Sequence, residues 1–478
     1  MSDVDAVLAR LEQPTPSAGW LSDSTITRTV RRRRTRRRLL AGVAVLVVAG
    51  TLTGVGVSGS GSSGRPPLAG PSIRLVPGQH VGSRIAGAVQ LVGNVSTLPS
   101  DPASLTAVSA ADQRLTVALL KRLGTSSDTN VSISPTSLYL ALGMLENGAA
   151  GTTQRQIATA LQAGDLSLNA QNSGLAQLAT SLQAAAAKEG ITLQSANSLW
   201  QQQGFALHQQ FLSAIATYFH AGVWQTDFAG HNAAAVAAID QWTSEQTHGK
   251  ITKLFDHLDP ATVLVLANAL YFHAAWAVPF TPSESDPGPF TTATGSTVQP
   301  IFMTGVSTTA AITDHYRAVA LPYAGKRFEA VAIMPTGKTL ARYVDSLTPA
   351  GLASVFTAVD AGRTSPFRLP RFTTTSKTDL VPTLQSLGMT QAFGVSADFS
   401  ALSTTPTQVA QAVQRVYLGV GEKGTTAAAV TGIQMAQTSA RALGPETILF
   451  NNPFLFLIRD RTTGAILFAT EVNDPTAG

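Results

Sequence analysis

The sequence predicts an α+β fold in which helices come first along the chain and strands come later. Residues 105–256 carry apolar residues at helical spacing, whereas the chain after residue 262 contains short apolar runs separated by proline and glycine. With 44% hydrophobic and 13% charged residues, the chain can bury a large core. No internal repeat divides it. We therefore expect one domain, residues 105–475, preceded by segments of different character.

The net positive charge belongs to the N-terminus. The chain carries +5, and residues 1–38 alone hold nine arginines against four acidic residues. The rest has 24 basic and 24 acidic residues. A neutral domain has no net field to attract phosphate, so we expect no nucleic-acid partner. The chain has no cysteine, which excludes disulfides, thiol catalysis and thiolate metal sites.

Residues 39–57 are uncharged and directly follow seven arginines at positions 31–38. As a helix, this segment would be roughly 28 Å long, enough to cross a hydrocarbon core. Arginines on the amino side of a span place that side in the cytoplasm. We expect residues 1–38 to be a basic cytoplasmic tail and residues 39–57 a single membrane-spanning signal-anchor. The domain then lies outside the cytoplasm.

Two alternatives stay open for residues 39–57. Residues 35–40 resemble a twin-arginine motif, so the segment could be a cleaved export signal and the protein secreted. A buried core helix is the other alternative, but the arginine flank could not be buried with it. Residues 58–64 are serine and glycine, followed by Pro66 and Pro67, a composition typical of flexible linkers. We expect a linker over residues 58–104.

The first half of the domain is expected to be mostly helical. Leucines recur at helical spacing from Leu115 to Leu123. Ser134 and Pro135 interrupt the chain before an apolar stretch, residues 138–145, and the polar residues at 152–156 are typical of a capped helix start. Stretches rich in alanine and glutamine around residues 165–195 indicate further helices.

Strands are expected from residue 262 onward. Residues 262–267 form a continuous apolar run, as in a strand covered on both faces. Further strand candidates are residues 319–321, 328–334, 367–369, 414–420, 448–450, 454–458 and 465–469.

The motifs of enzyme chemistry are weak. Residues 419–424 match GxGxxG, but only 54 residues follow Gly424, too few for the crossover helix and strands of a dinucleotide-binding fold. The nearest suitably spaced acid, Glu446, precedes its strand. No HExxH, GxSxG or Walker motif occurs, and no two of the eight histidines have ligand spacing in an acidic context. Serine, histidine and aspartate all occur, but nothing singles out a nucleophile. We expect no enzyme activity and no cofactor.

Residues 425–435 have the period of a strand although they precede two strands that the core already needs. Every second residue from Thr425 to Met435 is small or apolar and can be buried, while the alternate residues can face water or a covering helix. If such a loop is held out of a sheet and then cut, its free end can insert, and each backbone hydrogen bond contributes about 1 kcal/mol. An alanine-rich surface helix is the alternative.

Several stretches resemble the serpin family and occur in the family's order. Residues 421–429 resemble the hinge of inhibitory members, residues 450–458 the strand after the reactive loop, and residues 464–468 the final strand. Residues 268–272 with Trp276 and residues 279–280 are similar to the segment that opens onto the central sheet. Residues 134–137 resemble the shutter, where that sheet parts. Residues 247–251, 369–372 and 397–400 also match.

The resemblance covers residues 105–475 and implies helices packed on three β-sheets, mostly antiparallel or mixed, with an exposed reactive-centre loop. It implies a suicide inhibitor that traps a target serine protease as a covalent acyl-enzyme, in a bacterial member that is membrane-anchored or exported and monomeric. The hinge residues it implies are Glu422, Gly424, Thr425, Thr426, Ala427, Ala428 and Ala429. The shutter and breach residues it implies are Ser134, Pro135, Ser137, Asn268, Trp276 and Gln414.

Two departures from the family pattern matter. Gln414 stands where the family has a shutter histidine, and the reactive loop is longer than in antitrypsin-like members. Counting forward from the hinge places the scissile bond at Thr438-Ser439, which suits elastase-like or subtilisin-like proteases. Counting back from Phe450 places it near Arg441-Ala442 or one residue later, and Arg441 suits trypsin-like proteases. We favour Thr438. Both departures also leave open a serpin-fold binding protein that does not inhibit.

Overall fold

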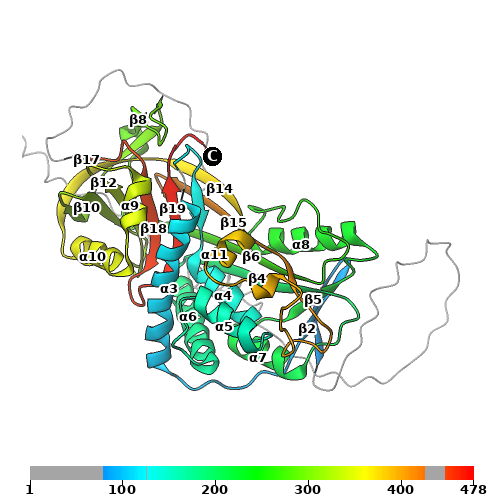
Figure 1. Ribbon diagram of the computed structural model, residues 1–478. Helices are drawn as coiled ribbons and strands as arrows, with labels where there is room; N and C mark the ends of the chain where they lie inside the picture. Colours follow the sequence, from blue (N-terminus) through cyan, green and yellow to red (C-terminus); the bar gives the residue numbers. More distant parts are fainter. Residues whose placement is uncertain (1–78, 125, 426–446, 478) are drawn as a thin grey trace, which may run out of the picture. The chain divides into compact units, whose positions relative to one another are not determined.

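Two large β-sheets with helices packed on and between them make up the described part of the chain (Figure 1). This is a computed structural model, and it describes residues 79–124, 126–425 and 447–477. An eight-stranded sheet, a nine-stranded sheet and a two-stranded ribbon are present among these residues. The predicted α+β fold with three sheets is confirmed. The predicted tail, residues 1–38, the predicted span, residues 39–57, and linker residues 58–78 lie outside the described residues.

The eight-stranded sheet, sheet A, has the strand order β1-β2-β5-β4-β6-β16-β15-β14. Its two central long strands, β6 and β15, run parallel and pair from Leu264 with Val409 to Leu270 with Val416. The strands span His80–Ile85 (β1), Ala88–Val92 (β2), Val223–Thr226 (β5), Thr192–Gln202 (β4), Leu264–Ala275 (β6), Gly424–Thr425 (β16), Val409–Gly421 (β15) and Phe372–Asp379 (β14).

The nine-stranded sheet, sheet B, has the order β17-β13-β10-β11-β12-β18-β19-β3, with β7 paired to β10. Its strands span Ile448–Leu449 (β17), Arg363–Pro370 (β13), Ile301–Ile312 (β10), Tyr316–Pro322 (β11), Phe328–Pro335 (β12), Phe454–Asp460 (β18), Ile466–Val472 (β19), Val131–Ile133 (β3) and Asp286–Pro287 (β7). Phe290–Thr291 (β8) and Thr297–Val298 (β9) form the ribbon. Every strand predicted from residue 262 onward is confirmed.

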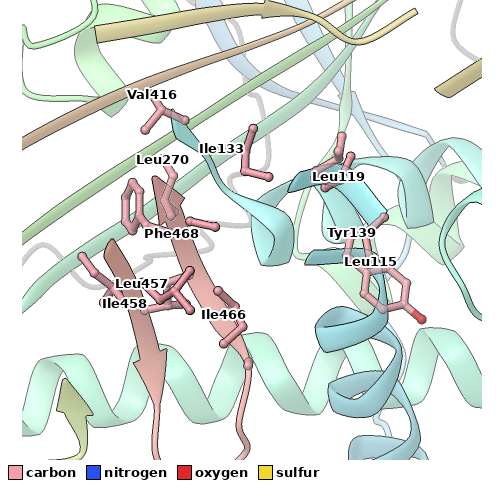
Figure 2. Packing of buried hydrophobic residues seen from close by; sticks show 14 of the residues in the cluster. Leu115, Leu119, Ile133, Tyr139, Leu270, Val416, Leu457, Ile458, Ile466 and Phe468 are labelled. Atoms are coloured by element: carbon pink, nitrogen blue, oxygen red, sulfur yellow. The ribbon is translucent and has the colours of Figure 1, made fainter. Parts of the chain in front are cut away.

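Helix α4 (Pro135–Glu146) lies between the two sheets and contacts β4 and β6 of sheet A and β19 of sheet B. Ser134 caps it and Pro135 is its first residue, as the sequence predicts. Figure 2 shows Leu270 of β6 and Val416 of β15 in the same core as Phe468 of β19. The other helices are α3 (Pro102–Leu123), α5 (Gly151–Ala160), α6 (Leu168–Glu189), α7 (Gln209–Phe219), α8 (Asn232–Gln246), α9 (Leu340–Ser346), α10 (Pro349–Asp360) and α11 (Leu380–Ser386).

A second, smaller core covers the other face of sheet A beneath α8. Trp200 of β4 stacks on Trp224 of β5 with ring centroids 5.1 Å apart, and Trp242 of α8 meets Trp200 edge-on at 6.0 Å. Val265 and other residues of β6 join this cluster. Sheet A is therefore buried on both faces at its centre, which explains the continuous apolar run of β6.

The predicted linker, residues 58–104, is wrong from residue 79 onward. Residues 80–92 form the β1–β2 hairpin at the edge of sheet A, and α3 begins at Pro102. Glycine and serine in this segment indicate flexibility, but Ala88, Val89 and Leu91 are buried and β2 completes its ladder on β5. The expected helical region also contains β4 and β5, because serine, asparagine and glutamine in β4 obscure its alternation.

Two buried carboxyl groups should make stability depend on pH. Burial raises the pKa of Asp112 on α3 and the pKa of Glu146 on α4 to about 7, from 3.8 and 4.5. At a pH between the ordinary and the raised pKa values, these two carboxyl groups are protonated in the native state and ionised in the unfolded chain. The free energy of unfolding contributed by these groups therefore falls as pH rises from about 4 to 7.

Asp112→Asn removes the charge and keeps an acceptor for the Ile466 amide, which lies 2.7 Å from the Asp112 carboxylate. We expect the variant to have a higher Tm than the wild type at pH 7.5 and little difference at pH 4.5. Thermal unfolding followed by circular dichroism at both pH values measures this. Exposed Asp314→Asn is the control. A Tm difference that stays constant across pH would contradict the expectation.

Candidate functional site

The candidate site is the place where the two central strands of sheet A part. The ladder between β6 and β15 ends at Leu270 and Val416. At the far end, β16 lies between them: Thr425 pairs with Ala274 of β6 and with Val420 of β15. Sheet A thus has a strand position between β6 and β15 that the hinge has begun to occupy.

Thr425 is fully buried at this position. Its hydroxyl lies 2.5 Å from the hydroxyl of Tyr323, which is also fully buried, and burial raises the pKa of Tyr323. Gly424 has φ +154°, and a Cβ there would overlap the carbonyl of Ala274. Only glycine therefore lets the chain turn into the sheet at residue 424. The predicted hinge residues Gly424 and Thr425 are therefore part of the sheet.

Trp276 holds the turn that leads into β16. Its indole Nε1 donates to the carbonyl of Gly421 at 2.8 Å, and its ring stacks on Tyr323 at 4.5 Å. The backbone amide of Trp276 donates to Lys423 O at 3.1 Å. Glu422, the next predicted hinge residue, lies 3.6 Å from a guanidinium nitrogen of Arg371, which is 43% exposed. Solvent screens this pair, so geometry rather than charge fixes the turn.

A buried cluster of neutral side chains, the shutter cluster, ties β6, β15 and α4 together below this point. Gln414 of β15 accepts from the Ser134 amide at 2.8 Å and donates to Ser134 O at 3.0 Å, and it also donates to the side-chain carbonyl of Asn268 on β6. Asn268 donates to Ser137 O at 3.0 Å and to its hydroxyl at 2.8 Å. The structure brings together the predicted Ser134, Ser137, Asn268 and Gln414.

Sequence reasoning missed two members of this cluster, Ser195 and Asn197 of β4. Asn197 pairs with Asn268 across the ladder and accepts from the Ser137 hydroxyl at 3.0 Å, and the Ser195 hydroxyl lies 3.0 Å from that of Ser137. Both point to the same face because they lie two residues apart in a strand. Two polar residues at that spacing signal a buried network only when residues 192–202 are already known to be a strand.

Gln414 is fully bonded within the shutter cluster although it stands where the family pattern has a histidine. Its amide both donates and accepts at Ser134, so it closes the network between β15 and the start of α4. The shutter cluster contains only amides, hydroxyls and backbone groups, none of which titrates at physiological pH. Entry of a strand between β6 and β15 would separate Gln414 from Asn268.

The segment after α8 covers the parted strands. The ring of His248 lies 5.0 Å from that of Tyr271 on β6, and Lys250 Nζ lies 5.5 Å from the ring of Tyr417 on β15. Further along, Asp256 accepts from Lys377 of β14 at 2.6 Å. This covering segment, residues 247–258, therefore spans the opening between β6 and β15.

The two ends of the predicted reactive loop are anchored in different sheets. Its start, β16, lies in sheet A, and its end, β17, runs parallel to β13 in sheet B. Several predicted site residues between them lie outside the described residues: hinge residues Thr426, Ala427, Ala428 and Ala429, and the candidate scissile-bond residues Thr438, Ser439, Arg441 and Ala442.

The described residues hold neither a metal-ligand cluster nor a membrane-spanning helix. No three histidine, aspartate or glutamate side chains there are grouped as metal ligands would be. Within the same ranges, no helix has the length and apolar character needed to cross a bilayer.

Known proteins share this arrangement. The family model described as serpin (serine protease inhibitor) matches residues 110–475. The chain belongs to the serpin family. Iripin-2 of Ixodes ricinus is 31% identical over 374 residues, which cover 76% of this chain and 92% of that protein.

Solved structures support the same assignment. The native state of tengpin, a thermophilic serpin, is 28% identical with a TM-score of 0.69, and the match covers 80% of this chain and 97% of tengpin. Human thyroxine-binding globulin in complex with thyroxine also gives 28% identity and a TM-score of 0.69, with 78% of this chain and 100% of that chain covered. The serpin fold of the domain is therefore established.

Gln414→Ala should destabilise the intact serpin. It leaves the buried Ser134 amide and carbonyl and the Asn268 side-chain carbonyl without this partner, at a cost of about 3 kcal/mol in the free energy of unfolding. Urea unfolding at pH 7.5 measures the loss. Gln411→Ala, at a partly exposed position on the same strand, is the matched control. Equal losses in the two variants would show that the shutter cluster does not hold the sheet closed.

Proposed function

We propose that this serpin inhibits serine proteases by inserting its cut reactive loop between β6 and β15. The observation that carries the proposal is the position of Thr425, which lies fully buried between these strands as the first residue of an additional strand. Residues that follow Thr425 are small and alternate as a central strand requires. The hinge is therefore already directed into the sheet.

A cut in the reactive loop frees the chain end that is to insert between β6 and β15. In the intact chain the loop is held at both ends, by β16 in sheet A and by β17 in sheet B. Once the chain is severed, its N-terminal part can extend along β6 and β15, and each new backbone hydrogen bond contributes about 1 kcal/mol. About ten such bonds with side-chain burial outweigh the shutter and covering-segment contacts that must break, so insertion does not reverse.

The protease catalyses each step up to formation of the acyl-enzyme. The protease serine Oγ attacks the carbonyl carbon of the scissile bond, an ester forms, and the amine of the C-terminal part leaves with a proton from the protease histidine. The serpin's contribution is to move the esterified loop end, with the bound protease, along sheet A. Displacement that distorts the protease before water hydrolyses the ester leaves a covalent complex.

The scissile bond we propose is Thr438-Ser439. The hinge supports this choice, because Thr425 is the first inserted residue and the length from there to the bond sets how far the protease travels. Arg441-Ala442 is the alternative from the other end of the loop. Thr438 favours proteases with small apolar specificity pockets, whereas Arg441 favours trypsin-like proteases with an acidic pocket.

The proposed location is the outer side of a membrane. Seven arginines before the uncharged segment 39–57 support a single span with the serpin domain outside the cytoplasm, or export with removal of the segment. The domain would act there as a monomer on proteases from outside the cell.

Binding of a small ligand without protease inhibition is the second candidate function, favoured by the similarity to thyroxine-binding globulin.

Incubation with trypsin, subtilisin and elastase tests the inhibitory function. We expect a complex with subtilisin or elastase that survives SDS. After denaturation separates the C-terminal fragment, its mass should show that it begins at Ser439. A fragment that begins at Ala442 would move the scissile bond to Arg441. Cutting by every protease, with full turnover and no complex, would contradict inhibition and leave the carrier function.

Thr425→Arg should abolish trapping without preventing cutting. An arginine cannot be buried between β6 and β15 beside Tyr323, so insertion stalls at its first residue. We expect the yield of SDS-stable complex to fall at least tenfold while the loop is still cut. Lys423→Arg introduces the same side chain at an exposed position two residues away and should trap normally. An unchanged yield for Thr425→Arg would refute insertion.

A further inference from the structure

A group of basic side chains lies on the face of sheet A that the covering segment overlies. Arg415 of β15 pairs directly with Lys377 of β14 across the ladder, so both side chains leave the sheet on the same face. Val413 and Tyr417, two residues before and after Arg415, pack into the smaller core beneath α8. Arg415 and Lys377 therefore project on the side of the sheet opposite α4.

The covering segment places two further cations at this face. The Nζ of Lys250 lies 5.5 Å from the ring of Tyr417, and the Nζ of Lys253 lies 3.0 Å from one carboxylate oxygen of Asp256. The other oxygen of Asp256 lies 2.6 Å from the Nζ of Lys377. These two lysines lower the pKa of Asp256 to about 2, so its carboxylate is ionised at neutral pH. A single carboxylate thus serves two ammonium groups.

Arg415 is left without a counter-ion. In the part of the chain that the structure describes, its guanidinium makes no ion pair, and its buried Nε has no hydrogen-bond partner. Like charges directly opposite each other on neighbouring strands destabilise a sheet, and Lys377 is opposite Arg415. The basic cluster, which consists of Lys250, Lys253, Lys377 and Arg415, therefore sets four positive charges against the one negative charge of Asp256.

Two other carboxylates of the adjoining elements are engaged by backbone amides. Asp379, two residues after Lys377 on β14, accepts from the Val381 amide at 3.0 Å at the start of α11. Asp240 of α8 accepts from the Leu254 amide at 2.7 Å. A buried donor such as the Nε of Arg415 normally has an acceptor. An anion from outside the chain can supply it.

Phosphate and sulfate have the chemistry that the basic cluster requires. A guanidinium presents a planar fork of donors that matches the oxygens of a tetrahedral oxyanion, and lysine ammonium groups add compact charge. A doubly charged anion balances Arg415 and Lys250, the two cations of the cluster that Asp256 does not contact. Direct contacts suffice to hold such a small ion, although residues 39–478 together carry no net charge.

We propose that Arg415, Lys377 and Lys250 form a binding site for a small doubly charged oxyanion, phosphate or sulfate. The site lies between β15 and the covering segment, so a bound anion links the two and stabilises the intact domain by mass action. This site is independent of the proposed protease inhibition, and its test requires no target protease.

Thermal unfolding of the full-length protein at pH 7.5 tests the site. Sodium phosphate is increased while sodium chloride is adjusted to keep the ionic strength constant. We expect the Tm to rise and then level off, because a ligand that binds only the native state stabilises it in proportion to its occupancy. Sulfate should act in the same way, whereas nitrate, which carries one charge, should have little effect.

Arg415→Gln removes the guanidinium and keeps a polar side chain of similar reach. We expect the phosphate concentration for half the Tm gain to rise roughly tenfold or more. Without phosphate the Tm should be no lower than that of the wild type, since the substitution also ends the repulsion between Arg415 and Lys377. Lys250→Gln, at an exposed position of the covering segment, should weaken the response as well and serves if Arg415→Gln does not fold.

The matched control is Arg363→Gln at an exposed position of β13 in sheet B, which should respond to phosphate as the wild type does. The arginines of residues 1–38 are common to all these proteins, so anion binding there cancels in the comparison. Equal Tm gains in phosphate and nitrate would overturn the site. A phosphate response that Arg415→Gln and Lys250→Gln leave unchanged would overturn it too.

Discussion

The pairing of β6 with β15 is the interaction on which the rest of the structure depends. These strands are parallel neighbours over Leu264–Leu270, yet at the far end β16 already lies between them. Parallel strands with a free position between them can accept an antiparallel third strand without changing the direction of either. The contacts described above either hold these two strands together or position the predicted hinge, which would enter between them.

Two sets of contacts hold the pair together, and they differ in chemistry. The shutter cluster uses buried neutral hydrogen bonds at the centre of the sheet. The covering segment uses ring and cation contacts, such as Lys250 with Tyr417, on the opposite face of the sheet from α4. Because hydrogen bonds within one buried network are cooperative, the shutter cluster yields as a unit, whereas the contacts of the covering segment can loosen separately.

Sequence reasoning recovered the strands of the second half, because proline and glycine mark the ends of strongly apolar runs such as Phe454–Asp460. It also located the shutter residues from their resemblance to a family. It could not find β4, whose partly buried Ser195 and Asn197 find a hydrogen-bond partner in Ser137 of α4, elsewhere in the chain. The hairpin was missed for a related reason: its strands are short, and β2 completes its hydrogen bonds on β5, a pairing that composition does not reveal.

The anchoring of the loop end in sheet B has a consequence for what a cut produces. The chain after the loop contributes β17 and then β18 and β19, and β18 lies between β12 and β19 with every residue buried. A protease that severs the loop therefore releases no free peptide. The C-terminal piece stays as two interior strands of its sheet, and the nicked molecule persists as a tightly associated two-chain protein that only denaturation would resolve.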